Sequence, residues 1–138
     1  MRRFALLGLV LLGVAGCSVY PTIQKAGGVR IRPENGRALQ AAPAGGTAVV
    51  YVDVVNTGGA DDTLIGVQSD AAGRAELRSR NGRIGDVPVP AATTVALASD
   101  DRHIELYDLM RELKAGDVII VTLLFEKSGA VGAITVVQ

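Results

Sequence analysis

The sequence predicts an all-β protein, and more specifically a Greek-key β-sandwich. Segments rich in β-branched and aromatic residues recur along the chain, and residues 47–56 (TAVVYVDVVN) are the clearest of them. Clusters of Gly, Pro, Asn and Asp separate these segments roughly every ten residues, as they do in sandwiches. Only residues 108–114 (DLMRELK) have helical character, and they are short enough to form a single turn or a loop. Seven or eight short strands therefore account for the fold.

The expected strands follow from alternation of apolar and polar residues and from the turn residues between them. In chain order they are an edge strand over 29–32, and then 47–56, 63–69, 74–79, 93–97, 102–107, 117–125 and 132–137. Residues 33–36 (PENG) predict a turn after the first strand, and Asn81-Gly82 predicts a hairpin. Residues 87–90 (VPVP) are extended but cannot form a central strand, because proline lacks the N–H donor.

The segment over 117–125 (DVIIVTLLF) is the most apolar of these strands and is predicted to be central. Its alternation directs one set of side chains inward: Ile119, Val121, Leu123 and Phe125. Alternation also places Arg74, Glu76 and Arg78 on one face of their strand. A third set shares one face of the strand over 102–107: His103, Glu105 and Tyr107.

Length and composition limit the classes of function. The 138 residues fit one domain, since domains typically contain roughly 100–150 residues. Fourteen Lys and Arg balance fourteen Asp and Glu, whereas a nucleic-acid-binding protein usually carries a basic excess. A single Cys excludes an internal disulfide and a cysteine-cluster metal site, and a single His excludes a multi-histidine zinc site. We therefore expect no nucleic-acid partner.

The N-terminus resembles the signal of a bacterial lipoprotein. Two arginines precede an uncharged apolar run over residues 4–16, whose 13 residues are fewer than the roughly 20 that a transmembrane helix needs. The run ends in VAGC, where small residues precede Cys17 as in a lipobox. This resemblance implies cleavage before Cys17 and lipidation of Cys17, which would anchor the chain to a membrane of the cell envelope, on its extracytoplasmic side. The alternative is an ordinary secretory signal with an incidental cysteine.

We therefore divide the chain into three parts. Residues 1–16 form the signal peptide, residues 17–28 contain the lipidated Cys and a linker, and residues 29–138 form the β-sandwich domain.

Three stretches, taken together, resemble the periplasmic copper chaperones of the PCu(A)C type. They are residues 51–58 (YVDVVNTG) with 62–66 (DTLIG), residues 74–77 (RAEL) with 87–91 (VPVPA), and HIEL from residue 103 with LKAGD from 113 and LFEKSG from 124. Their order and spacing cover about residues 45–137. The resemblance implies a cupredoxin-like, immunoglobulin-like sandwich that holds Cu(I) through a His, Met, His, Met pattern. Such donors suit Cu(I), which is soft and prefers thioether and imidazole ligands.

The sequence departs from this ligand pattern at three of the four positions. Arg78 stands where the first His of the family follows the Glu-Leu pair, and Asn81 is the nearest counterpart of the first Met. His103 keeps the second His, but Glu105 replaces the second Met, and Met110 lies outside the pattern. At about 4 Å and an effective dielectric constant of about 20, the fixed charge of an arginine repels a monovalent cation by about 4 kcal/mol. The resemblance therefore does not carry the copper site over to this chain.

Opposite charges at Arg78 and Glu105 suggest what replaced the metal. In the family, the residues at these positions converge on one ion, so their side chains must approach each other. We predict that Arg78 and Glu105 form an ion pair across the former site, with His103 beside it. His103 is interpreted as a retained family residue on an exposed face, with metal ligation as the alternative. Glu105 is interpreted as a solvated or paired carboxylate, with a role as an oxygen ligand as the alternative.

Two further groups of charged residues have alternative interpretations. Five acidic residues are read as turn residues, because they lack the ligand spacing of a calcium loop: Asp53, Asp61, Asp62, Asp100 and Asp101. Five arginines form either a solvated face or a basic patch for an anionic partner: Arg74, Arg78, Arg80, Arg83 and Arg102.

No combination of nucleophile, His and acid, and no phosphate-binding loop, supports catalysis, so we expect no enzymatic activity. The main hypothesis is a membrane-anchored binding module for an envelope protein, without a cofactor. The alternative is a copper-binding or copper-delivering chaperone that uses His103 with non-standard ligands. An accessory or structural subunit of an enzyme is a third possibility. The sequence leaves the identity of the partner and the oligomeric state open.

Overall fold

The computed structural model describes residues 28–138, and this part of the chain contains ten strands and no helix. The strands are β1 (Ile31–Ala38), β2 (Ala48–Asn56), β3 (Asp62–Ser69), β4 (Ala72–Ser79), β5 (Gly82–Arg83), β6 (Val87–Val89), β7 (Thr93–Leu97), β8 (His103–Leu109), β9 (Val118–Phe125) and β10 (Gly129–Val137). The prediction of an all-β fold is confirmed. No helix of residues 28–138 is long and apolar enough to cross a membrane. The predicted signal peptide, Cys17 and nearly all of the linker lie outside the described residues.

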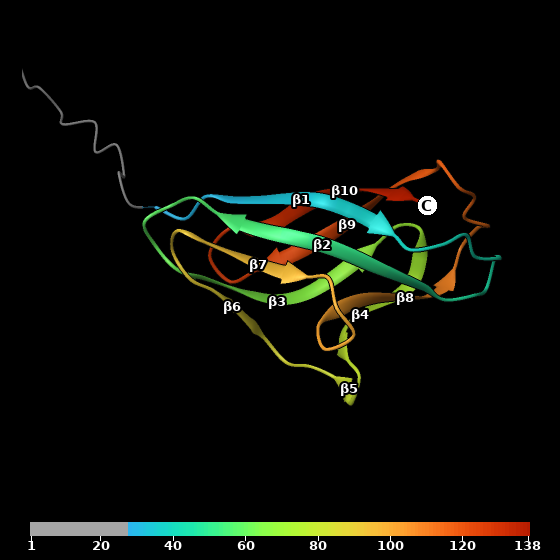
Figure 1. The fold of residues 1–138 in the computed structure, drawn as a ribbon, viewed down its shortest axis with the longest axis horizontal. Coiled ribbons are helices and arrows are strands. Elements are labelled where there is room, and N and C mark those ends of the chain that lie inside the picture. The colour runs from blue at the N-terminus through green and yellow to red at the C-terminus, as the bar shows by residue number, and fades with distance from the viewer. Residues whose placement is uncertain (1–27) are drawn as a thin grey trace, which may run out of the picture.

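The strands form one hydrogen-bonded path that folds over on itself. Its order is β5-β4-β8-β2-β1-β10-β9-β3-β6, and β7 pairs with the second half of β2 beside the path. In Figure 1, β9 and β10 lie behind β1 and β2, so that the sheet encloses a core between its two layers. Only β1 and β10 pair in parallel; the other described pairs are antiparallel.

The core comes from the inward positions of these strands. Alternation on β2 buries every second residue, including Val50, Val52 and Val54. On β9 the four predicted inward residues are all buried: Ile119, Val121, Leu123 and Phe125. β9 is also central as expected, since it pairs with β10 on one side and β3 on the other. A side chain of this kind contributes about 1.5–3 kcal/mol when it is fully buried, so the core stabilises the fold without a metal.

The predicted turn at residues 33–36 is wrong. These residues lie inside β1, which is an interior strand between β2 and β10 and not an edge strand. A β-bulge between Glu34 and Arg37 accommodates the turn-forming residues, and Asn35 takes a positive φ of 55° there. Gly36 is required at this point, because a Cβ would collide with the carbonyl oxygen of Ile134 on β10.

The helical character of residues 108–114 is not realised; the loop alternative is the one that forms. β8 continues to Leu109, and the chain then bends so that Leu113 pairs with Ala42 in an isolated β-bridge. The Leu113 side chain is fully buried at this bridge. Its burial explains why an apolar residue stands here without a helix.

Asp62 ties the start of β3 to the turn between β9 and β10. Its Oδ1 accepts hydrogen bonds from the backbone N–H groups of Thr63 (2.8 Å) and Lys127 (2.9 Å). Its Oδ2 accepts from the N–H (2.9 Å) and the hydroxyl (2.6 Å) of Ser128. Burial opposes ionisation, but these hydrogen bonds hold the pKa of the Asp62 carboxyl below its usual value. The side chain therefore has a structural role.

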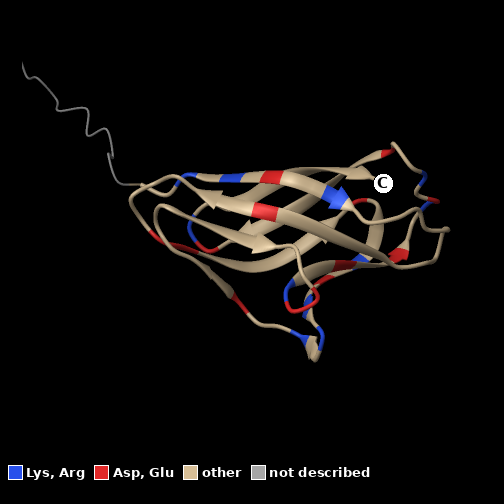
Figure 2. Cartoon of the chain, viewed as in Figure 1, with Lys and Arg blue, Asp and Glu red and all other residues tan. Residues whose placement is uncertain are grey.

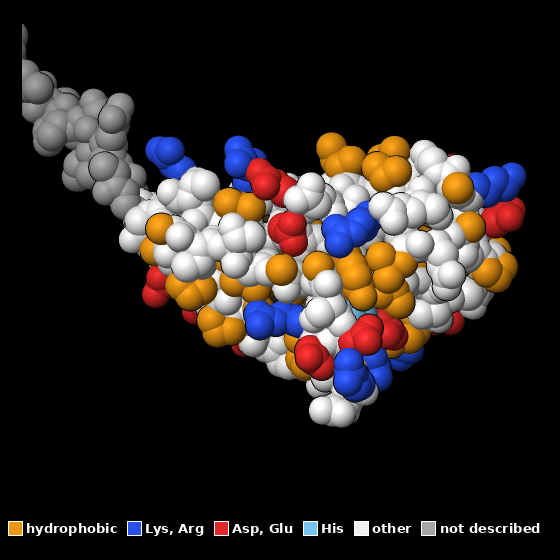
Figure 3. All heavy atoms as spheres, in the orientation of Figure 1, with side chains coloured by type: hydrophobic (Ala, Val, Ile, Leu, Met, Phe, Trp, Pro, Cys, Tyr) orange, Lys and Arg blue, Asp and Glu red, His pale blue; other side chains and the backbone are white. Residues whose placement is uncertain are grey.

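Charged residues are distributed unevenly over the fold. β9 and β10 contain none, whereas β4, β8 and the turns beside them contain many (Figure 2). Figure 3 shows acidic and basic side chains gathered together at the end of the molecule formed by β4, β5 and the turn before β8. This end carries the residues that the sequence singles out as the former metal site.

Candidate functional site

The site lies on the antiparallel pair formed by β4 and β8. The register places Arg78 opposite His103 and Glu76 opposite Glu105, with Arg74 opposite Tyr107 one pair further along. Because side chains alternate between the two faces of a strand, all six project on the same face. We call these six residues the charged cluster: Arg74, Glu76, Arg78, His103, Glu105 and Tyr107.

The predicted ion pair between Arg78 and Glu105 is present. The Nε of Arg78 lies 3.6 Å from Oε2 of Glu105, and its Nη1 lies 3.1 Å from Oε2 of Glu76. The hydrogen bond to Glu76 raises the pKa of Arg78 further above its already high value. Arg78 therefore pairs with two carboxylates, Glu76 on its own strand and Glu105 on the neighbouring strand, and not only with the predicted partner Glu105.

Glu105 is the centre of the cluster. Its Oε1 lies 3.0 Å from Nε2 of His103, and its Oε2 accepts a hydrogen bond from the Tyr107 hydroxyl in addition to facing Arg78. Burial of the Glu105 carboxyl opposes its ionisation, but the hydrogen bonds from Tyr107 and His103 and the nearby positive charges hold its pKa below the usual value. Glu105 is therefore an ionised, paired carboxylate, in agreement with the interpretation from sequence.

Tyr107 is held in its neutral form. Burial, followed by the hydrogen bond to Glu105, raises the pKa of the Tyr107 phenol to about 12. The Arg74 guanidinium lies over the Tyr107 ring, 4.5 Å from its centroid, and its Nε is 3.8 Å from Oε1 of Glu76. Arg74 and Tyr107 thus extend the network along both strands.

His103 is buried, and the expectation that it lies on an exposed face is wrong. The residue is only 7% exposed, because the turn at Ser99 covers one side of the ring and Tyr51 approaches it with ring centroids 6.4 Å apart. Both of these contacts come from residues outside β4 and β8, which alternation within those strands does not reveal.

Both ring nitrogens of His103 face hydrogen-bond acceptors. Nδ1 lies 3.0 Å from the carbonyl oxygen of Ser99, which only accepts, so Nδ1 carries a proton. Nε2 lies beside the carboxylate of Glu105, which also only accepts. Both ring nitrogens are therefore occupied by protein partners. A metal needs a free ring lone pair, so binding through Nε2 would require Glu105 to move away.

The structure does not bring Asn81 into the cluster. Asn81 is exposed in the turn between β4 and β5, where its backbone N–H donates to the Ser79 hydroxyl at 3.2 Å. Within residues 28–138, no group of three or more His, Cys, Asp or Glu side chains has the arrangement of a metal site. Of the four former ligand positions, the structure therefore unites Arg78, His103 and Glu105.

Three members of the cluster were not predicted as site residues from the sequence: Arg74, Glu76 and Tyr107. Glu76 and Tyr107 were placed on the correct faces by alternation, but their partners depend on the β4–β8 register. The five arginines do not form one basic patch. Arg74 and Arg78 pair with Glu76, and Arg80 lies 3.5 Å from Asp100, so acidic residues are interspersed among them.

The fold of this all-β domain is similar to that of PCuAC copper-chaperone domains. The chain belongs to the LpqE-like putative lipoprotein family, whose model matches residues 28–137. A putative lipoprotein of Leifsonia xyli subsp. xyli, Lxx21020, is 30% identical over 140 residues, which cover 91% of this chain and 82% of the relative.

Solved structures confirm the likeness to copper-chaperone domains. The copper-bound PCuAC domain from PmoF2 is 28% identical with a TM-score of 0.68, and the match covers 80% of this chain and 95% of that domain. The apo form of the same domain is 29% identical with a TM-score of 0.64, covering 80% of this chain and 92% of that domain. The resemblance inferred from the sequence is therefore confirmed at the level of family and fold.

Proposed function

We propose that this protein is an extracytoplasmic lipoprotein, anchored through Cys17, that acts as a non-catalytic binding module for a partner in the cell envelope. The family description supports the lipoprotein assignment, and the VAGC junction supports Cys17 as the modified residue. Two or more acyl chains would hold the domain stably at the membrane surface, whereas one chain gives only marginal binding.

The proposal includes loss of the Cu(I) site, and one observation carries it. Both nitrogens of the His103 ring face acceptors, at 3.0 Å each, so the one retained family ligand is committed to protein partners. In the cluster the fixed positive charges of Arg74 and Arg78 balance the carboxylates of Glu76 and Glu105. No excess negative charge therefore remains to attract a further cation.

The second candidate function is copper binding through non-standard ligands. The similarity to a copper-bound domain favours it, as does the presence of imidazole, carboxylate and phenol groups side by side at His103, Glu105 and Tyr107. Such nitrogen and oxygen donors suit Cu(II) better than Cu(I). Binding would have to displace the hydrogen bonds that His103 and Tyr107 make with Glu105.

Calorimetric titration with Cu(I) and with Cu(II) separates the two candidates. The mature chain carrying Cys17→Ser is titrated under anaerobic conditions for Cu(I) and in a weakly coordinating buffer for Cu(II). The binding-module proposal predicts no stoichiometric binding stronger than about 10 µM, which corresponds to roughly −7 kcal/mol. Stoichiometric submicromolar binding that His103→Ala abolishes would instead establish the copper function.

A further inference from the structure

The curled sheet is left open between β3 and β4, which are consecutive in the chain but lie near opposite ends of the hydrogen-bonded order. β6 pairs with β3 only as far as Leu64, so residues 65–69 of β3 have no strand partner on that side. Similarly, β5 pairs with β4 only at Arg78 and Ser79, so residues 72–76 of β4 have no strand partner on the side away from β8. Unpaired strand edges present backbone donors and acceptors that can take up another strand.

A groove runs along this opening. Its wide end has a volume of about 400 Å³ and is lined by residues 65–67 of β3, residues 75–77 of β4 and the connection over residues 83–86. A second hollow of about 280 Å³ continues toward the turn that joins the two strands, and Ala75 lines both hollows. Residues 65–69 extend over about 16 Å at roughly 3.3 Å per residue, which is the length of a five-residue extended segment.

Residues 65–69 of β3 lack the features that commonly block strand addition, whereas β4 presents charged side chains. Residues 65–69 (IGVQS) contain no proline and no charged residue, the features that commonly protect an edge strand. Gly66 adds no side chain of its own, so the backbone there can be approached closely. On the opposite side, β4 presents Arg74 and Glu76, which belong to the charged cluster.

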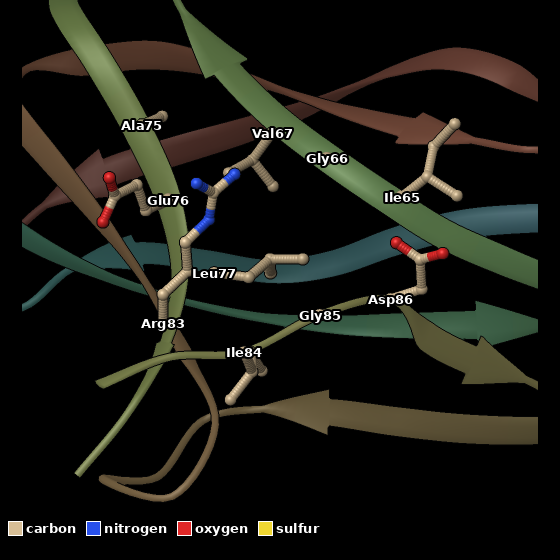
Figure 4. Close-up of a pocket in the computed structure, with 10 residues that line it drawn as sticks. All are labelled: Ile65, Gly66, Val67, Ala75, Glu76, Leu77, Arg83, Ile84, Gly85 and Asp86. Atoms are coloured by element: carbon tan, nitrogen blue, oxygen red, sulfur yellow. The ribbon is translucent and has the colours of Figure 1, made fainter. Parts of the chain in front are cut away.

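The side chains of the groove indicate the chemistry of its occupant. The wide end combines apolar and charged side chains: Val67, Leu77 and Ile84 line it together with Glu76, Arg83 and Asp86. Ile65, which also lines it, is 49% exposed. In Figure 4 the side chain of Arg83 extends from β5 across the groove toward Val67. Among residues 28–138, no carboxylate lies within 4.0 Å of the Arg83 guanidinium, unlike those of Arg74, Arg78 and Arg80.

We propose that this groove binds an extended peptide segment of a partner protein, about five residues long, which adds as a strand to the free edge of β3. Alternate aliphatic side chains of the segment fill the wide end against Val67, Leu77 and Ile84, and an acidic side chain pairs with Arg83. The inference gives the proposed binding module a site and a partner chemistry. It rests on the open sheet edge and does not depend on whether the charged cluster binds copper.

A library of random linear heptapeptides displayed on phage tests this site. The library is selected against the mature chain carrying Cys17→Ser, and the enriched peptides are synthesised and titrated. We expect them to combine alternate aliphatic residues with an acidic residue, and Arg83→Glu to weaken their binding by about tenfold or more, since like charges would then meet. Arg102→Glu is the matched control, because Arg102 is exposed and does not line the groove, and it should leave binding within about twofold. Failure to enrich any peptide, or equal binding to Arg83→Glu and the unchanged protein, would overturn the proposal.

Methylation of the peptide backbone tests the strand pairing itself. In an added strand, alternate amide N–H groups face β3, so methylating those amides should abolish binding, whereas methylating the intervening ones should have little effect. If all positions respond alike, the peptide does not pair as a strand and the inference is wrong. The copper titration of the same protein is a separate readout, so failure here is distinguishable from failure of the proposed loss of the copper site.

Discussion

Arg78 and Glu105 lie on neighbouring antiparallel strands, and the guanidinium Nε of Arg78 is 3.6 Å from the Oε2 of Glu105. The pair is partly exposed, with 31% and 23% of the two side chains accessible, so by itself it stabilises the fold by only about 0–1 kcal/mol. Its importance comes from the other groups that share the same carboxylate, His103 and Tyr107. Glu105 thereby holds three donors in place at the position where the resemblance seen in the sequence predicts a soft copper ligand.

Replacing this carboxylate should therefore destabilise the protein more than an isolated surface pair would suggest. Glu105→Gln keeps one acceptor oxygen but removes the charge that faces Arg78 and His103. We expect the free energy of unfolding to fall by about 1–2 kcal/mol, measured by urea denaturation. Glu112→Gln is the matched control, because Glu112 is exposed, and its unfolding free energy should change by less than about 0.5 kcal/mol. Equal effects of the two substitutions would contradict the central role of Glu105.

The same carboxylate makes stability depend on acid pH. The pKa of Glu105 is lower in the folded protein than its ordinary value of 4.5, so the unfolded chain takes up the proton first as the pH falls. The stabilisation is thus complete above about pH 4.5 and is lost progressively as the pH falls from there through the folded value. Urea midpoints measured from pH 6 to pH 3 should therefore decline less steeply for Glu105→Gln than for the unchanged protein. Parallel profiles would show that Glu105 is not a source of the acid sensitivity.

The β4–β8 face could be predicted from the sequence because it depends only on alternation within two strands. The alternation of side chains along each strand placed Arg78 and Glu105 on faces that could meet. The family resemblance supplied the register between the two strands. The burial of His103 could not be predicted in this way, because Ser99 and Tyr51 cover the ring from other parts of the chain. The same limit applies to β1, where residues with strong turn preferences are held in a strand by β2 and β10. At β1, pairing with distant strands overrode the local turn preference; at His103, contacts from the preceding turn and from β2 buried a ring that alternation had placed on an exposed face.

Asp62 provides a test of the fold away from the charged cluster. The Asp62 carboxylate accepts four hydrogen bonds, two at each oxygen. Asp62→Asn would replace one of these oxygens by an NH₂ group, which is itself a donor and would face the donors that this oxygen now satisfies. We expect a loss of about 2–3 kcal/mol in the free energy of unfolding, measured in urea. Asp70→Asn is a suitable control because Asp70 is exposed. A loss at Asp62 no greater than that at Asp70 would mean that the connection between β3 and the β9–β10 turn contributes little.

Membrane anchoring is expected to depend on Cys17 alone. In Cys17→Ala the diacylglyceryl group has no sulfur to attach to, so the lipid anchor cannot form. Cell fractionation should show the unchanged protein in the membrane fraction and Cys17→Ala either unprocessed or released from that fraction. Equal membrane retention, with normal processing of the variant, would refute the lipoprotein assignment of Cys17.

Restoring the family's ligands should restore copper binding if the scaffold is intact. Arg78→His, Asn81→Met and Glu105→Met together supply two thioethers and an imidazole and remove the fixed charge of Arg78. Loss of Glu105 also leaves Nε2 of His103 without its protein partner, so this nitrogen can turn its lone pair to a metal. The position of residue 81 is the weak point, because the turn between β4 and β5 holds it exposed and apart from the cluster. The double variant without the change at Asn81 therefore measures what that position contributes.

Thermal unfolding with and without copper gives the decisive comparison. A ligand that binds only the folded state adds about 2.7 kcal/mol at a free concentration one hundred times its Kd. For a domain of this size, that raises Tm by roughly 8–15 °C. We expect such a rise for the triple variant with Cu(I), confirmed by competition with a chromogenic Cu(I) chelator, and a smaller one for the double variant. The unchanged protein should melt at the same temperature with chelator as with excess copper, because His103 and Glu105 remain engaged with each other. A rise in the unchanged protein equal to that of the triple variant would show that the charged cluster opens to admit the metal, and the copper-binding alternative would then replace the binding module without copper.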